Sequence, residues 1–212
     1  TEQEVFTRDE LIEKFSLKRV QKSGARFDEK RLLWLNGAHI RNIPVDKLYD
    51  YVSPWDDNPQ KDGGQTGFWP ESAYAPNITK EYRMKVLALA QDRLKMFEDL
   101  RGFGYFFAEP EINLELIDGN KQLKKLSENE RRKLLETARH ELAKLAVWTP
   151  ESIQNCLNKL LEITSQKPGI LFSLIRIAVT WAPFSPQLND TLALIGRGRT
   201  MARLQSYLES KE

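Results

Sequence analysis

Helix-start signals recur along this chain, and they constrain its fold more than any other feature. Thr7 and Ser127 are each followed three residues later by a glutamate. In this pattern the hydroxyl and the glutamate each bond a backbone N–H group that the helix itself leaves free. Thr149-Pro150 and Ser185-Pro186 each place a capping residue before a proline at the first helical position. All four sites therefore predict the beginning of a helix.

Apolar residues at helical spacing follow these signals and predict a mostly α fold. The apolar runs at 105–107 and 114–117 lie between turn signals, but both are too short to favour strands. The expected helices cover 8–15, 29–41, 45–52, 80–98, 121–126, 128–146, 150–164, 169–180, 187–195 and 198–208.

The chain is large enough for one large or two small hydrophobic cores, with 212 residues of which 41% are hydrophobic. Its longest apolar-rich run, 169–183, is interrupted by Ser173, Arg176 and Thr180, which favours a buried helix over a membrane span. Cys156 is the only cysteine, so an intrachain disulfide and a thiol-based metal site are excluded, and a core thiol is expected. These features are typical of a protein of the bacterial cytoplasm or an organelle matrix.

Two changes in composition divide the chain. Residues 53–78 are rich in proline and glycine and carry several aromatic residues, which indicates an irregular insertion whose return leg packs on the body. Near Val147 to Pro150 the chain passes from a highly charged helix into a more apolar region. The predicted segments are 1–52, 53–148 with the insertion at 53–78, and 149–212.

The positive charge is local, since the net charge is only +2. Near the end of the chain, Arg197, Arg199 and Arg203 form a small cluster. Such clusters can neutralise phosphates and release counterions. A solvated basic helix face is the alternative. The larger cluster occupies fourteen residues with only two acids and consists of Lys18, Arg19, Lys22, Arg26, Lys30 and Arg31.

The two ends of the chain resemble one known family. The stretch VFTRDELIEKFSLKRVQKSGARFDEKRLLWLNGAHIR, residues 5–41, is similar to the pattern F-(S/T)-x-x-R-V…FD-x-x-K-L-x-W-x-N-G-x-(Y/H)-I-R that follows the catalytic core of bacterial-type glutamyl-tRNA synthetases. The end of the chain resembles that family's K-x-G…L-R-x-A-(V/L)-T-G…S-P…L-x-L-L-G ending. The residues that carry this second match are Lys167, Gly169, Arg176, Ala178, Val179, Thr180, Ser185, Pro186, Leu192, Leu194 and Gly196.

The resemblance implies a helical subdomain that contacts the tRNA stem, followed by two helical anticodon-binding subdomains. The His-Ile-Gly-His and Lys-Met-Ser-Lys-Ser strings of the ATP-binding catalytic domain do not occur. We therefore expect no catalytic, cofactor or metal residues here, with ATP and Mg²⁺ belonging to a catalytic domain that this chain lacks. The expected partner is tRNA(Glu), with tRNA(Gln) as a second candidate, and neither DNA nor a membrane. The chain is expected to be a monomer without activity of its own.

In this family the first segment grips the stem of the tRNA, where phosphate contacts fix register without reading sequence. Asn36 and Gly37 are expected to end or cap a helix rather than to touch RNA. The phosphate-binding candidates are Lys18, Arg19, Lys22, Arg26, Lys30, Arg31 and Arg41.

The resemblance also assigns anticodon contacts. Positions of the family that contact the first two letters are occupied by Arg176, Ser185, Pro186 and Leu188, and Arg197 and Arg199 are further candidates near the end. An internal salt bridge is the alternative role for Arg176. Trp181 stands where the family commonly has glycine.

The third anticodon letter separates glutamate from glutamine tRNA. In some members of the family, an arginine on the long middle helix is associated with accepting C and rejecting G at this letter, and aligning that helix by its apolar spacing places Arg93 at the same position. A shift of two residues would place Gln91 there instead. A surface ion pair with Asp92 as neighbour is the simpler role for Arg93. The alternative function for the whole chain is a helical protein-interaction module without an RNA role.

Overall fold

The computed structural model describes residues 3–20, 24, 26–53 and 67–210. Every regular element in these ranges is an α-helix or a short 3₁₀ helix, labelled α and η, and none is a strand. The prediction of a mostly α fold is confirmed. No helix of the described part is long and apolar enough to cross a bilayer.

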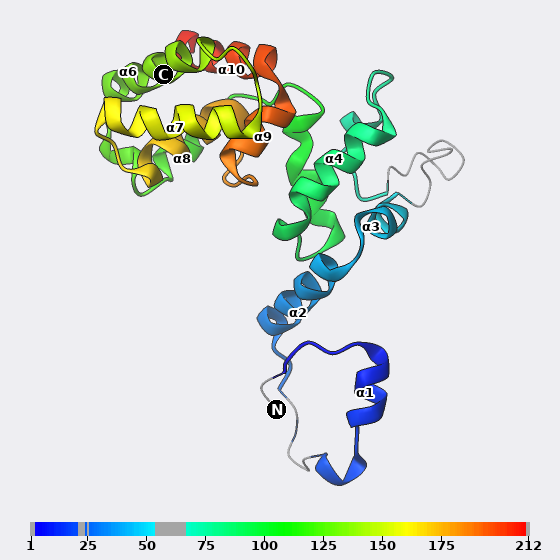
Figure 1. Ribbon diagram of the computed structural model, residues 1–212. Coiled ribbons are helices and arrows are strands. Elements are labelled where there is room, and N and C mark those ends of the chain that lie inside the picture. Colours follow the sequence, from blue (N-terminus) through cyan, green and yellow to red (C-terminus); the bar gives the residue numbers. More distant parts are fainter. Residues whose placement is uncertain (1–2, 21–23, 25, 54–66, 211–212) are drawn as a thin grey trace.

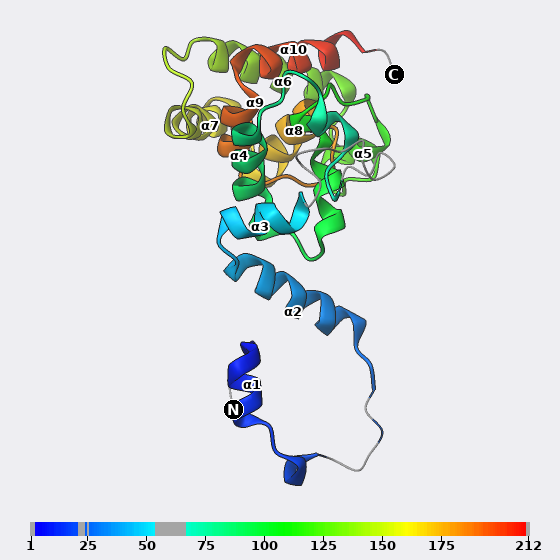
Figure 2. The same ribbon diagram turned by 90° about the vertical axis from the view of Figure 1, so that its right-hand side faces the viewer.

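The N-terminal part stands apart from the body of the molecule (Figures 1 and 2). It consists of α1 (Arg8–Lys14), η1 (Leu17–Arg19) and α2 (Glu29–Asn42), and α2 joins it to the rest. The predicted capping box at Thr7 is confirmed: its N–H donates to the Glu10 carboxylate at 2.7 Å. No described side chain before Gly37 is buried, so only the second half of α2 contributes to the core.

The middle of α2 contacts a distant segment of the chain. The expectation that Asn36 and Gly37 end or cap a helix is wrong, because α2 continues to Asn42. A Cβ on Gly37 would lie 3.0 Å from the Leu94 carbonyl oxygen, so glycine permits the close approach. The Asn36 side-chain amide donates to the Lys95 carbonyl. These two residues therefore join α2 to the backbone that follows α4.

The middle of the chain forms α3 (Val45–Val52), η2 (Glu71–Tyr74), α4 (Lys80–Ala90), η3 (Gln91–Arg93) and η4 (Phe97–Phe106). The predicted helix 80–98 is therefore too long, since α4 ends at Ala90. The Asp99 carboxylate accepts the N–H groups of Lys95 and Met96, which begins η4 and competes with a continuous helix. Apolar spacing alone does not reveal the break. Leu94 fits the buried face of a continuous helix, and it is also buried in the broken one.

The irregular stretch at 53–78 returns to the body as predicted, although residues 54–66 lie outside the described ranges. Trp69 is buried, and its indole N–H donates to the Ser53 hydroxyl at 2.7 Å. Its ring also packs edge-on against Phe107. The two ends of the insertion are thus tied together beside α3.

The C-terminal part is a helical bundle (Figure 1). Thr149 and Ser127 cap α7 and α6 as predicted. Ser185 does not cap the next helix, because α9 begins only after Gln187. Helix α7 lies against α6 and α9, and α10 lies against α6 and α8. The elements are α5 (Glu115–Asp118), η5 (Leu123–Lys125), α6 (Glu128–Ala143), α7 (Pro150–Thr164), α8 (Pro168–Thr180), α9 (Leu188–Ile195) and α10 (Arg197–Glu209).

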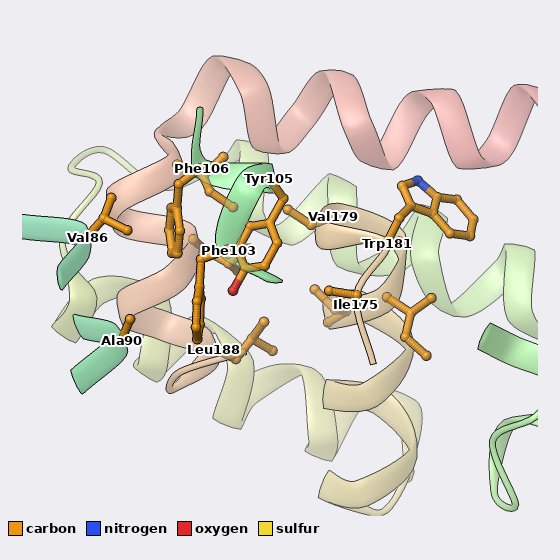
Figure 3. Packing of buried hydrophobic residues seen from close by; sticks show 14 of the residues in the cluster. Val86, Ala90, Phe103, Tyr105, Phe106, Ile175, Val179, Trp181 and Leu188 are labelled. Carbon is orange, nitrogen blue, oxygen red and sulfur yellow. The ribbon is translucent and has the colours of Figure 1, made fainter. Parts of the chain in front are cut away.

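One cluster of buried apolar residues runs from α2 to α10 and spans all three predicted segments. In Figure 3, Phe103 and Tyr105 of η4 pack between α8 and Leu188 of α9. Cys156 is buried, as expected of a core thiol. On the bundle surface, Lys144 and Lys159 both donate to the Glu141 carboxylate and lower its pKa to about 2.

Candidate nucleic-acid interface

Two arginines from different elements lie close together on the body. Arg176 is carried by α8, and its Nε donates to the Ser185 hydroxyl at 2.9 Å. That hydroxyl donates in turn to the Pro186 carbonyl at 2.9 Å. Burial is the main cause that lowers the pKa of Arg176, and the nearby charge of Arg93 lowers it further. The structure therefore brings Arg93, Arg176, Ser185 and Pro186 together, although they are separated in sequence.

Neither arginine of this pair has an acidic partner among residues 3–20, 24, 26–53 and 67–210. Among the ion pairs of the described residues, none involves Arg93 or Arg176. The alternatives of an internal salt bridge for Arg176 and a surface ion pair for Arg93 are therefore not what the described structure shows. Two like charges held near each other repel, and a polyanion that binds between them relieves that repulsion.

Gln91 and Arg93 face different surroundings. Gln91 is buried, and its side-chain amide donates to the carbonyls of Ile40 and Ile43 at the end of α2. Arg93 is exposed. Arg93 rather than Gln91 thus faces the solvent.

Leu188 and Ser185 contribute little surface. Each is only 5% exposed, and Leu188 belongs to the buried cluster drawn in Figure 3. Tyr105 is also buried here, and its hydroxyl has no hydrogen-bond partner within the described part of the chain. Burial raises the pKa of Tyr105, and the charge of Arg176 opposes this effect. The polar groups beneath the arginine pair are thus largely enclosed.

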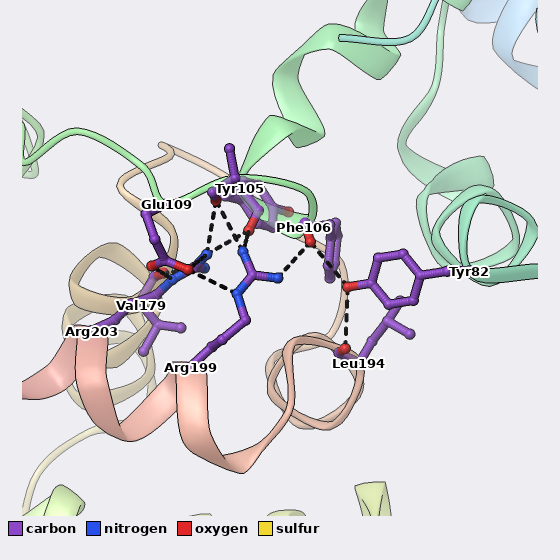
Figure 4. Close-up of polar contacts among 9 residues, drawn as sticks. Tyr82, Tyr105, Phe106, Glu109, Val179, Leu194, Arg199 and Arg203 are labelled. Atoms are coloured by element: carbon purple, nitrogen blue, oxygen red, sulfur yellow. Dashed lines mark hydrogen bonds and ion pairs between the residues drawn. The ribbon is translucent and has the colours of Figure 1, made fainter. Parts of the chain in front are cut away.

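The basic cluster near the end of the chain is bound internally (Figure 4). Arg203 is 3% exposed and donates to the carbonyls of Val179 and Tyr105 and to the Glu109 carboxylate. The interpretation of Arg203 as part of a phosphate-neutralising cluster is therefore wrong. A buried arginine with several carbonyl partners instead joins α10, α8 and the end of η4.

Arg199 and Arg197 also have internal partners. Arg199 donates to the Phe106 carbonyl at 2.7 Å and to Glu109 at 2.8 Å, and Arg197 donates to the Ala143 carbonyl. A hydrogen bond from Arg203, with a further bond from Arg199, lowers the pKa of Glu109. Sequence alone did not reveal this role, because Glu109 lies about ninety residues before its partners.

The predicted phosphate-binding residues lie on the N-terminal part and on α2. Arg26, Lys30 and Arg41 are exposed, as is Lys18. Arg31 is exposed and forms an ion pair with Glu4 at 3.1 Å. Solvent-exposed pairs of this kind contribute little to stability and exchange readily. Lys22 lies outside the described residues, and of Arg19 only the backbone is described.

Comparison with known proteins shows which family this chain resembles. The family model described as "Anticodon binding domain" matches residues 47–208. The chain is 31% identical over 210 residues to a glutamate–tRNA ligase of Chloroflexus aurantiacus and 35% identical over 210 residues to one of Roseiflexus sp.. These matches cover 99% and 96% of this chain but only 40% and 38% of the two ligases.

A solved structure has the same fold. The crystal structure of a glutamate tRNA ligase from Elizabethkingia meningosepticum, in complex with its amino acid, matches with a TM-score of 0.65 at 20% identity. The match covers 95% of this chain and 36% of that one. The resemblance seen in the sequence is confirmed by these comparisons. This chain belongs to the anticodon-binding domain family, in a form similar to that of bacterial glutamate–tRNA ligases.

Proposed function

We propose that this chain is the tRNA-binding part of a glutamate–tRNA ligase and that it recognises tRNA(Glu). Its relatives are named as ligases of glutamate and tRNA, and the chain spans about 40% of their length. Joining glutamate to tRNA, with the ATP and Mg²⁺ that this requires, is assigned to the rest of such a ligase. The isolated chain is expected to bind tRNA without aminoacylating it. The bacterial cytoplasm or an organelle matrix is the proposed location.

The observation that carries this proposal is the pair Arg93 and Arg176, which forms no ion pair within the described part of the chain. A guanidinium is flat, permanently charged and able to donate two parallel hydrogen bonds, so it suits the edge of an unstacked base as well as a phosphate. Arg176 is fixed by the Ser185 hydroxyl, which reduces the conformational entropy that binding must remove. We assign the third anticodon letter to Arg93, because Gln91 is committed to the end of α2.

The other predicted contacts receive less support. Arg197 and Arg199 could reach a base only by giving up their bonds to backbone carbonyls. The stem contacts are assigned to the exposed cations of the N-terminal part, which can neutralise phosphates without reading sequence. The stem contacts remain part of the proposal only because these cations are exposed and can neutralise phosphates.

A titration of the chain with full-length tRNA(Glu) and with variants of its anticodon tests this function. Arg93→Ala is expected to weaken binding by roughly 1–3 kcal/mol and to abolish the difference between C and G at the third letter. Arg176→Ala is expected to act instead on variants of the first two letters. Arg139→Ala, which removes an exposed charge of α6, is the matched control and should change the affinity little.

Two results would contradict the proposal. If the unmodified chain bound every anticodon variant with equal affinity, the proposal that it recognises the anticodon bases would be refuted. Tight, salt-insensitive binding of a protein with no measurable binding of tRNA would favour a protein-interaction module, because phosphate contacts make RNA binding strongly dependent on salt.

A further inference from the structure

An exposed aromatic ring borders the arginine pair. Phe184 lies directly before Ser185, the residue that accepts the hydrogen bond from Arg176. Phe184 is 50% exposed, whereas the other phenylalanines among residues 67–210 are buried or half-buried. A single exposed apolar side chain is ordinary on a protein surface, so the charged groups beside Phe184 must decide what it can bind.

The backbone on both sides of Phe184 is anchored. Trp181 stacks on Tyr207 with ring centroids 5.7 Å apart, and the N–H of Ala182 donates to the Thr180 hydroxyl. On the other side Ser185 is buried and bonded. The exposed ring is therefore presented by a loop whose ends are fixed in the core.

The ring itself has one firm support. It packs nearly perpendicular to Phe103, with centroids 6.2 Å apart and planes at 75°. Phe103 is fully buried. A Cβ added at Gly102 would lie 3.8 Å from the ring of Phe184, which is ordinary contact distance. This support holds the orientation of the ring and leaves half of its surface free.

The charge beside the ring selects the class of partner. An apolar protein surface docked on Phe184 would have to approach Arg93 and Arg176 without a compensating anion, which is costly. Single-stranded RNA supplies both complements, since its phosphates are anionic and each base has a π face. Stacking of a base on an aromatic side chain contributes about as much as a good hydrogen-bonded contact and tolerates any base.

We infer that Phe184 is a stacking platform for one unpaired base of the bound RNA, next to the bases that the arginines contact. This inference rests on the proposed function. It adds a contact that does not depend on base identity, while Arg93 and Arg176 provide the discrimination. Phe184 was not among the predicted contacts, although its neighbours Ser185 and Pro186 were.

The test compares Phe184→Leu with Phe184→Trp in the chain of residues 1–212. Leucine keeps apolar packing on Phe103 but has no flat ring, whereas tryptophan keeps the ring. Phe184→Leu is expected to weaken tRNA(Glu) binding about tenfold with an unchanged salt dependence. Phe184→Trp is expected to bind tRNA(Glu) with the affinity of the unmodified chain. Ile163→Ala, which truncates another side chain that is 50% exposed, is the control and should have no effect.

A spectroscopic readout separates stacking from general packing. Transfer RNAs that carry 2-aminopurine at one of the three anticodon positions should show a change of emission on binding at one position, and Phe184→Leu should abolish that change. Unaltered affinity and emission in Phe184→Leu, with weakened binding in Arg176→Ala, would refute stacking and leave the proposed function intact. Absence of tRNA binding by the unmodified chain would overturn both.

Discussion

Replacing Trp181 tests how a strained backbone is compensated in this fold. Trp181 ends α8 with φ 46° and ψ 37°, in the left-handed region that disfavours residues with a Cβ by roughly 1–2 kcal/mol. Its ring is only 9% exposed and stacks on Tyr207, with planes at 16°. The packing of the ring thus opposes the strain of the backbone.

Two substitutions separate these contributions. Trp181→Ala loses the buried ring, at a cost of about 3–5 kcal/mol, and keeps the backbone strain. Trp181→Gly loses the same ring but relieves the strain, because glycine adopts positive φ freely. We therefore expect both variants to be less stable than the unmodified chain, and the glycine variant to be about 1 kcal/mol more stable than the alanine variant.

Urea unfolding followed by far-UV circular dichroism measures these differences. In a thermal melt, about 1 kcal/mol corresponds to a shift of roughly 2–4 °C for a chain of this size. Ser165→Gly is the matched control, since Ser165 also has positive φ, 51°, but its side chain is exposed. That variant should gain stability. An alanine variant as stable as the glycine variant would refute the argument from strain.

Three further predictions concern stability. Gly37→Ala places a Cβ 3.0 Å from the Leu94 carbonyl oxygen and should lower the free energy of unfolding by about 1–3 kcal/mol in urea titrations. Gln91→Ala leaves the carbonyls of Ile40 and Ile43 without their side-chain donor and should cost about 1–3 kcal/mol by the same measurement. Glu141→Gln should be less stable than the unmodified chain at neutral pH. Because the pKa of Glu141 falls from 4.5 to about 2 on folding, that difference should shrink as the pH falls through this interval, and a constant difference would contradict it.

Local signals in the sequence predicted much of the helical structure. The capping boxes at Thr7 and Ser127 and the cap at Thr149 begin helices as expected, because each uses groups only three residues apart. Ser185 carries a similar signal but bonds to Arg176 instead, since that partner becomes available only after the bundle folds. Short-range patterns therefore predict a helix start reliably only where no long-range partner competes for the capping side chain.

The sequence was enough to predict which cations belong to the candidate site, but not which groups each cation contacts. Arg93 and Arg176 were singled out from the resemblance, and their proximity follows from packing that no local pattern contains. Arg203 carries the same charge but is buried against backbone carbonyls from distant elements. The sequence near Phe184 offered one signal, an aromatic residue between two prolines and next to the predicted contacts Ser185 and Pro186.

The contact between α2 and the end of α4 fixes the distance between the cations at the start of α2 and Arg93. Gly37 and Gln91 hold the helix that carries Lys30 and Arg41 against the turn that carries Arg93. If Lys30 and Arg93 contact two parts of one RNA, α2 fixes the distance between those two contacts. An RNA whose arm is longer or shorter would then meet only one of the two contacts, so the chain would discriminate between RNAs by the length of that arm.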